Sequence, residues 1–251
     1  MRGDRMDPFL RNGRSMLLAY DQGLEHGPST DFDDRNVDPG FIMDVAVKGG
    51  FNGVVFQKGV AERFYNGKVP LIVKVNGKTS LVRGEPVSRQ VCSVEQATAL
   101  GAKGVGYTIY LGSEYESAML AEFGRVEEEA HRRGIAAIAW IYPRGASVQN
   151  DTSKEIVAYA ARTGLELGAD AVKIKYSGDS ASFSWAVKSA AGVHVFMSGG
   201  PKAPTDDAFL EQVKGVIQAG ATGVAVGRNV WQNSDPVRMA EQIKRVVFQS
   251  G

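Results

Sequence analysis

The sequence of 251 residues has few of the side chains that commonly form crosslinks or bind transition metals. Cys92 is the single cysteine, which excludes an internal disulfide and fits a reducing compartment. The three histidines, His26, His131 and His194, do not lie at ligand-like spacings from one another or from Cys92. We therefore expect no His-rich or Cys-rich metal site, although an all-carboxylate site for a hard cation stays open. His131 lies in a highly charged helical stretch, where we expect it to be solvated.

The chain also lacks an excess of charge and long apolar runs. Lys and Arg number 29 against 28 Asp and Glu, so there is no electrostatic case for nucleic acid or an anionic membrane as partner. Any bound anion must be held by local groups. No run reaches the length of about 18 apolar residues that a membrane span needs, and residues 1–14 are charged without an apolar core. We expect neither a membrane span nor a signal peptide, and a cytoplasmic location is the default.

A regular alternation of short apolar runs and amphipathic stretches fills the chain. Glycines close many of the amphipathic stretches just before the next apolar run, as short connections from helix to strand require. We expect strands at 16–20, 53–57, 70–76, 104–110, 136–142, 171–177, 193–197 and 223–226, and helices at 40–48, 60–65, 94–100, 114–133, 154–167, 181–191, 206–219 and 236–248. Eight such units favour a single (β/α)8 barrel domain over residues 1–251. The alternative is an open flavodoxin-like or Rossmann sheet, for which about five or six strands would suffice.

The stretch 169–179 places two lysines on one predicted strand. Side chains alternate between the faces of a strand, so Lys173 and Lys175 share a face. Predicted helices flank this strand on both sides, which indicates burial. Burial and a second ammonium group about 6 to 7 Å away both disfavour charging, so at least one lysine should have a depressed pKa and act as a nucleophile. Alternatively, the lysines protect an exposed sheet edge, but a closed barrel has no edge.

In a barrel, chemistry belongs at the carboxyl ends of the strands. The first strand ends in Asp21, and His26 follows in a polar loop that an ordinary turn would also explain. Trp140, Tyr142 and Arg144 are two positions apart at the end of the fifth predicted strand, so their side chains share one face. The two aromatic residues could equally belong to the core. The third strand carries Lys74 and Asn76 on one face.

Glycines follow the seventh and eighth strands. The first group is Ser198-Gly199-Gly200 and the second is Gly227-Arg228. In this fold, the loops after these two strands commonly bind phosphate through backbone N–H groups, and glycine permits the close approach. A flexible turn is the structural alternative for the first group.

These segments together resemble the archaeal-type class I fructose-1,6-bisphosphate aldolases, which are (β/α)8 barrels that work through a lysine Schiff base. The resemblance covers almost the whole chain. Its motifs are LAYDQGLEHGP (18–28), GEPVS (84–88), GYTIYLGS (106–113), WIYPRG (140–145), ADAVKIKYSGD (169–179), MSGGPK (197–202) and AVGRNVWQ (225–232). The sequence departs from the family at Gln22, where histidine is common, and we assign no role to that position.

The resemblance implies a role for each matched residue. Lys173 would form the Schiff base, Tyr142 would donate and accept protons, and Asp21 and Trp140 would be their active-site neighbours. Ser198, Gly199, Gly200, Gly227 and Arg228 would bind one phosphate, and Arg144 and His26 would lie toward the distal end of the sugar. Independently of the resemblance, we expect Lys175 to belong to the substrate site and to lower the pKa of Lys173 as its charged neighbour. Parity alone does not choose between the two lysines of the strand.

The implied activity is reversible cleavage of fructose 1,6-bisphosphate, a step of glycolysis and gluconeogenesis, with a phosphorylated sugar as substrate. The resemblance also implies a homo-oligomer that needs no metal or organic cofactor. Alternatives are related enzymes on this scaffold, such as 2-amino-3,7-dideoxy-D-threo-hept-6-ulosonate synthase or a thiolase acting on a phosphorylated diketone. A non-catalytic phosphosugar-binding barrel would keep the glycine loops but would have no reason to bury two lysines.

Overall fold

The computed structural model describes residues 3–28 and 31–249. Its central feature is a closed barrel of eight parallel strands in the order β1-β10-β9-β8-β7-β6-β3-β2. These strands are β1 Ser15–Tyr20, β2 Gly53–Gln57, β3 Leu71–Lys74, β6 Gly104–Leu111, β7 Ala136–Pro143, β8 Ala171–Ile174, β9 His194–Ser198 and β10 Gly223–Val226. Because β1 pairs with β10, the sheet has no edge, which confirms the (β/α)8 barrel and rules out the open sheet.

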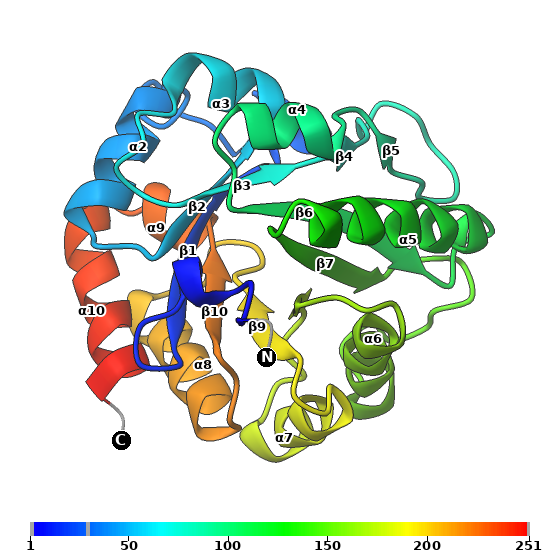
Figure 1. The fold of residues 1–251 in the computed structure, drawn as a ribbon. Helices are drawn as coiled ribbons and strands as arrows, with labels where there is room; N and C mark the ends of the chain where they lie inside the picture. The colour runs from blue at the N-terminus through cyan, green and yellow to red at the C-terminus, as the bar shows by residue number, and fades with distance from the viewer. Residues whose placement is uncertain (1–2, 29–30, 250–251) are drawn as a thin grey trace.

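Helices surround the strands as a ring, as Figure 1 shows. The ring consists of α2 Pro39–Lys48, α3 Lys58–Phe64, α4 Val94–Ala99, α5 Glu116–Arg132, α6 Lys154–Glu166, α7 Ser180–Ser189, α8 Asp206–Gln218 and α10 Pro236–Gln249. Side chains at the helix starts fix several boundaries: Ser93, Ser153, Asp179 and Thr205 each accept a hydrogen bond from the backbone N–H three residues later. None of the helices in the described ranges is long and apolar enough to cross a membrane.

Short elements outside this pattern were not predicted. They are the 3-10 helix η1 Asp7–Phe9, the helices α1 Gly23–His26 and α9 Arg228–Trp231, and a two-stranded sheet of β4 Asn76–Gly77 and β5 Arg89–Gln90. The predicted strand 70–76 therefore belongs to two sheets. The side chain of Asn76 explains the break, because it donates to the carbonyl groups of Ser88 and Thr108 and so turns the chain away from the barrel wall.

The predicted strand 171–177 is also too long, since β8 ends at Ile174. The chain then leaves the sheet, and the Tyr176 ring packs edge-on against Phe183 of α7. The prediction that Lys173 and Lys175 share the face of one strand is therefore wrong. Within β8, however, the alternation holds: Ala171 belongs to the core inside the barrel, while Val172 and Ile174 pack against the helices.

The amino-terminal segment closes the base of the barrel. Met6 and Phe9 are fully buried and join the interior core, and Figure 1 shows this dark blue segment across one end of the barrel. Two glycines make room for Phe9, since a Cβ atom would lie 2.9 Å from its ring at Gly53 and 3.2 Å from it at Gly104. The interior is thus packed at this end, and the pocket described below lies at the other.

Asp170, just before β8, ties three segments together at the same base. Its carboxylate accepts from the Ala137 N–H at 2.8 Å, from His131 Nε2 at 2.9 Å and from Arg5 at 3.2 Å. The expectation that His131 is solvated is wrong, because its side chain is 20% exposed and lies between Glu127 and Asp170. A charged helical stretch indicates a solvated helix face only when no side chain from another element pairs with it, and here Asp170 pairs with His131.

Candidate active site

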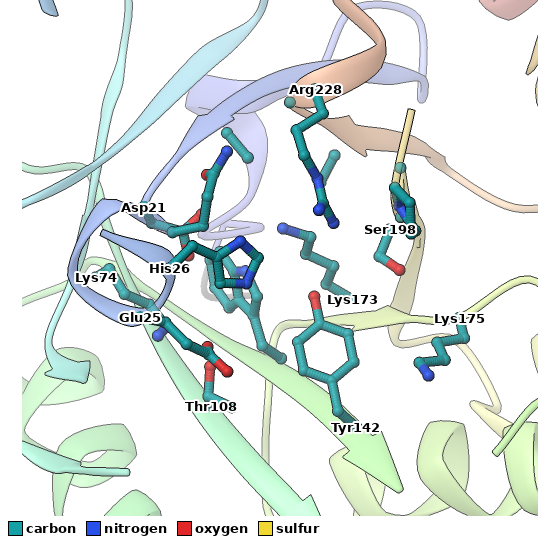
Figure 2. Close-up of a pocket in the computed structure, with 18 of the residues that line it drawn as sticks. Asp21, Glu25, His26, Lys74, Thr108, Tyr142, Lys173, Lys175, Ser198 and Arg228 are labelled. Atoms are coloured by element: carbon teal, nitrogen blue, oxygen red, sulfur yellow. The ribbon is translucent and has the colours of Figure 1, made fainter. Parts of the chain in front are cut away.

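One pocket lies at the carboxyl ends of the barrel strands and gathers the predicted residues (Figure 2). Its volume of about 260 Å³ suits a small molecule. All twelve residues expected from the sequence line it: Asp21, His26, Trp140, Tyr142, Arg144, Lys173, Lys175, Ser198, Gly199, Gly200, Gly227 and Arg228. Gln22, Glu25, Lys74 and Thr108 line it as well.

Lys173 of β8 reaches into the middle of the pocket and is 6% exposed. Burial lowers the pKa of its amine, the nearby cations Lys74 and Arg228 lower it further, and Asp21 opposes them. The Nζ atom also lies 5.2 Å from the centre of the Trp140 ring. The net lowered pKa increases the fraction of neutral amine, the form that can attack a carbonyl carbon.

Lys74 of β3 is the second buried lysine of the pocket, at 5% exposure. Its Nζ atom donates to the Asn76 carbonyl oxygen at 3.3 Å. Burial lowers the pKa of this amine too, against the charges of Asp21 and Glu25. The sequence placed Lys74 on a strand face but gave no signal that it lies near the lysine of β8, because closure of the barrel brings the two strands together.

Lys175 does not have the role expected of it. Its ammonium group pairs with Asp151, and its side chain is 25% exposed at the rim of the pocket. Figure 2 shows it to one side of Tyr142, away from the Lys173 amine. The cations that lower the pKa of Lys173 are Lys74 and Arg228, so the expectation for Lys175 is corrected.

Tyr142, near the end of β7, points its hydroxyl group toward the side chain of Lys173 (Figure 2). Burial raises the pKa of this phenol well above its ordinary value, and the negative charge of Asp21 raises it further. The hydroxyl group is therefore protonated at neutral pH and can give a proton to an oxygen that leaves the substrate. Asp21 lines the same pocket and supplies its carboxylate beside both groups.

Trp140 fits into the barrel interior because its neighbour on β6 has no side chain. A Cβ atom at Gly106 would lie 2.2 Å from the Trp140 ring. The ring is 2% exposed, and its Nε1 atom has no hydrogen-bond partner within the described ranges. The structure thus accepts an unpaired indole N–H in order to place a flat aromatic surface beside the buried amine.

The loops after β9 and β10 are joined by Asn229 of α9. Its buried side chain donates to Gly199 O at 2.8 Å and to Pro201 O at 3.0 Å, and it accepts from the Ala203 N–H at 2.7 Å. The Gly199 N–H donates to Ala225 O at 3.3 Å, so this amide does not face the pocket as a phosphate donor, contrary to expectation. The candidate donors that remain are the Arg228 guanidinium, the Ser198 hydroxyl group and the N–H groups of Gly200, Gly227 and the first turn of α9.

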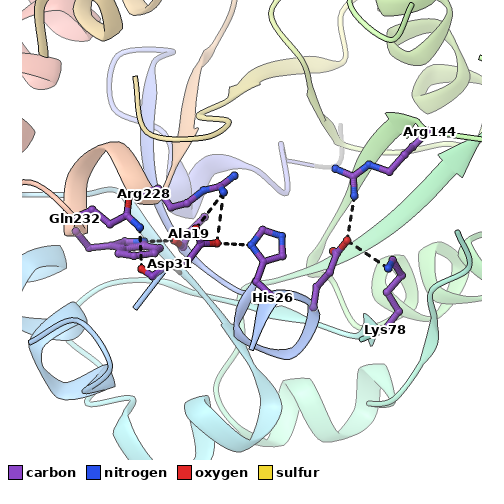
Figure 3. A network of polar contacts seen from close by, with 9 residues as sticks. Ala19, His26, Asp31, Lys78, Arg144, Arg228 and Gln232 are labelled. Carbon is purple, nitrogen blue, oxygen red and sulfur yellow. Dashed lines mark hydrogen bonds and ion pairs between the residues drawn. The ribbon is translucent and has the colours of Figure 1, made fainter. Parts of the chain in front are cut away.

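Two carboxylates of the segment after β1 hold the cations at the rim. Glu25 accepts from Tyr110 at 3.1 Å and from Arg144 at 3.0 Å, and it lies 3.6 Å from Lys78 Nζ. Asp31 contacts both His26 and Arg228. Figure 3 shows the two groups side by side. Neither carboxylate was predicted to be a site residue, because neither stands at the end of a strand.

The chemistry of this pocket is that of a lysine-based carbon–carbon lyase on a barrel: a buried amine of lowered pKa, a protonated phenol beside it, and cations around the rim. No group of three or more His, Cys, Asp or Glu side chains within residues 3–28 and 31–249 is arranged to hold a metal ion. The family model of the DeoC/LacD family aldolases matches residues 15–233, and the chain belongs to this family.

Characterised relatives agree with this assignment. The chain is 55% identical over 242 residues to the class 1 fructose-bisphosphate aldolase of Thermoproteus tenax, covering 96% of this chain and 92% of that protein. It is 43% identical to the class 1 fructose-bisphosphate aldolase of Halobacterium salinarum, covering 99% and 96% of the two chains. A solved archaeal fructose-1,6-bisphosphate aldolase, with its catalytic lysine bound covalently to the carbinolamine intermediate, is 54% identical with a TM-score of 0.94, covering 97% and 98%.

Proposed function

We propose that this protein is a Schiff-base fructose-1,6-bisphosphate aldolase that acts in glycolysis and gluconeogenesis. The observation that carries the proposal is Lys173, a buried amine of lowered pKa in the middle of the pocket with the Tyr142 hydroxyl group pointing toward it. A barrel that only bound phosphosugars would have no use for this pair. The relatives that are 55% and 43% identical are both named as class 1 fructose-bisphosphate aldolases, which favours this substrate over those of more distant enzymes.

The reaction begins when the Lys173 amine attacks the C2 ketone of the sugar. Tyr142 protonates the hydroxyl group of the carbinolamine, which leaves as water, and an iminium ion results. The iminium withdraws electrons while a base removes the proton of the C4 hydroxyl group. The C3–C4 bond then breaks, and glyceraldehyde 3-phosphate departs. Protonation of the remaining enamine at C3 and hydrolysis release dihydroxyacetone phosphate and the free lysine.

The rest of the pocket positions the substrate for these steps. Arg228, Ser198 and the glycines Gly200 and Gly227 would hold the C1 phosphate at the loops after β9 and β10. Arg144 and His26 would face the other end of the sugar, with Lys175 at the rim. Holding both ends fixes C2 near the amine, which converts binding into rate. Asp21 and Trp140 would complete the surroundings of the reacting carbons.

Borohydride trapping tests the proposal. Incubation with dihydroxyacetone phosphate and sodium borohydride should add the reduced ligand to the peptide that contains Lys173, read by mass spectrometry. Lys173→Met should abolish trapping. Lys74→Met and Lys175→Met are matched controls that remove another lysine of the same pocket, and trapping should persist in both. An adduct mapped to Lys74 or Lys175 would overturn the assignment.

We also propose that residues 1–251 form one aldolase domain that assembles into a cytoplasmic homo-oligomer. A candidate contact surface lies on α6 and α7, where Tyr159 is 64% exposed and Trp185 is 51% exposed. Large aromatic side chains of this exposure are common at protein interfaces. Light scattering after gel filtration should give a mass of several chains, and Tyr159→Glu with Trp185→Glu should reduce it. A single-chain mass for the unmodified protein would refute the assembly.

A further inference from the structure

Asp31 lies directly between two residues of the pocket that come from different segments. Its carboxylate accepts from Nδ1 of His26, the last residue of α1, and lies 3.4 Å from the Nη1 atom of Arg228, the first residue of α9. Figure 3 shows dashed lines from the Asp31 carboxylate to both of these side chains. The two pocket residues are thus connected through one carboxylate although they are far apart in the sequence.

The backbone of Asp31 is fastened to α9 as well. Its carbonyl oxygen accepts from Gln232 Nε2 at 2.8 Å, just beyond the end of that helix. Asp31 is 13% exposed, and the pocket lining contains His26 and Arg228 but not Asp31 itself. Burial raises the pKa of the Asp31 carboxyl group, but the hydrogen bond to His26 and the charge of Arg228 outweigh burial, and the net pKa is lowered. The group is therefore a permanent anion at neutral pH.

This contact restricts both partners. A carboxylate can only accept hydrogen bonds, so Nδ1 of His26 must carry a proton, which fixes the tautomer and the ring orientation. For Arg228, the contact engages Nη1, while the guanidinium keeps further N–H donors on Nε and Nη2 for an anion in the pocket. Both side chains lose rotamer freedom before any substrate arrives.

We propose that Asp31 is a positioning residue that aligns Arg228 for the C1 phosphate and His26 for the opposite end of the sugar. The inference rests on the proposed function, since it takes the two ends of the substrate as defined there. Because Asp31 does not line the pocket, it acts through the two side chains that it orients.

Charge and positioning make opposite forecasts for Asp31. The substrate is an anion, so removing a nearby negative charge should by itself strengthen binding and lower KM. If Asp31 aligns Arg228 and His26, its removal should raise KM instead. Loss of a charged hydrogen bond to the ligand itself would weaken binding about 10- to 100-fold. Because Asp31 acts indirectly, we expect a rise of roughly 3- to 10-fold for Asp31→Ala, smaller than that direct effect.

The experiment measures KM and kcat for fructose 1,6-bisphosphate and for dihydroxyacetone phosphate in Asp31→Ala and Asp31→Asn. Dihydroxyacetone phosphate carries only the C1 phosphate, so its KM reports Arg228, whereas fructose 1,6-bisphosphate reports both partners. Both KM values should rise in Asp31→Ala. Asp31→Asn keeps an oxygen that accepts from His26 and should mainly affect the Arg228 end. Asp34→Asn removes a charge from an exposed site in the same loop and should leave both KM values unchanged.

A double-mutant comparison isolates the route of the effect. In an Arg228→Met background, Asp31→Ala should no longer change the KM for dihydroxyacetone phosphate, yet it should still raise that for fructose 1,6-bisphosphate through His26. Nitrogen-15 NMR of the His26 ring should show Nδ1–H in the unmodified protein and a mixture of tautomers in Asp31→Ala.

Each outcome separates the two proposals. Lower or unchanged KM values in both Asp31 variants would overturn the positioning role while leaving the aldolase function intact. Loss of the folded state in both variants would assign Asp31 to stability alone and would also overturn it. If Arg228→Met itself leaves both KM values unchanged, then the phosphate site of the proposed function is wrong.

Discussion

Replacing Tyr142 by Phe distinguishes catalysis from packing because the structure forecasts no loss of stability. The Tyr142 hydroxyl group faces the pocket, and no hydrogen bond joins it to any residue of the described ranges. The usual cost of about 1 kcal/mol for a lost hydrogen bond therefore does not apply, and the melting temperature should change by less than about 2 °C. As the acid at the carbinolamine step, the same hydroxyl group should be worth roughly 10²- to 10⁴-fold in kcat.

The assay couples the release of glyceraldehyde 3-phosphate to NADH formation by a dehydrogenase and pairs kcat with a thermal melt. Tyr110→Phe is the matched control, because Tyr110 is buried and its hydroxyl group does donate, to Glu25 at 3.1 Å. This control should lose about 1 to 3 kcal/mol of stability and keep most of its kcat. If Tyr142→Phe melts like the unmodified protein and retains more than about a tenth of its kcat, another group moves the proton, and Asp21 is the next candidate.

Three further predictions follow from the same pocket. Lys74→Met removes a cation that lowers the pKa of Lys173, and because that amine attacks only when neutral, the acid limb of kcat/KM against pH should move to higher pH. Lys175→Met should leave this limb in place, because Lys175 pairs with Asp151. A shift in Lys175→Met without one in Lys74→Met would refute the corrected assignment. Gly106→Ala overpacks the barrel against Trp140 and should lower the melting temperature by roughly 2 to 12 °C, with recovery on adding Trp140→Leu but without recovery of activity. Asn229→Ala removes the hydrogen bonds that join the loops after β9 and β10, and it should raise the KM for fructose 1,6-bisphosphate and for dihydroxyacetone phosphate. An unchanged KM in a folded variant would show that these hydrogen bonds do not shape the phosphate site.

The sequence could predict those parts of the site that depend on local order. Glycine-ended helices followed by apolar runs indicated eight repeating units. The rule that chemistry lies at the carboxyl ends of strands selected Asp21 and Tyr142, and the predicted burial of their strand selected Lys173 and Lys175 together. All four line one pocket. The roles themselves came from the resemblance to a known family, and parity could not choose between Lys173 and Lys175.

The residues that escaped prediction are those whose contacts form only when the barrel closes. Asp31 and Arg228 are 197 positions apart, and Asn229 contacts a loop about 30 positions away. Lys74 was visible on its strand, but its influence on the β8 lysine depends on two strands that are not neighbours in sequence. Strand ends were also mispredicted at 74 and 174, because side chains of other elements decide where the chain leaves the sheet.

The contacts of Asp170 bear on the register in which strands β7 and β8 pair during folding. Asp170 is three residues before Lys173, about 10 Å along the chain. A shift of one residue in the register between β7 and β8 would turn that lysine from the barrel interior toward the helices. The barrel would still form, but the pocket would lack the buried amine of β8. The Asp170 carboxylate accepts a hydrogen bond from the Ala137 N–H, which forms only when β7 and β8 are in the observed register. Arg5 from the amino-terminal segment pairs with the same carboxylate. These contacts at the base of the barrel therefore favour the register that places the Lys173 amine in the pocket at the opposite end.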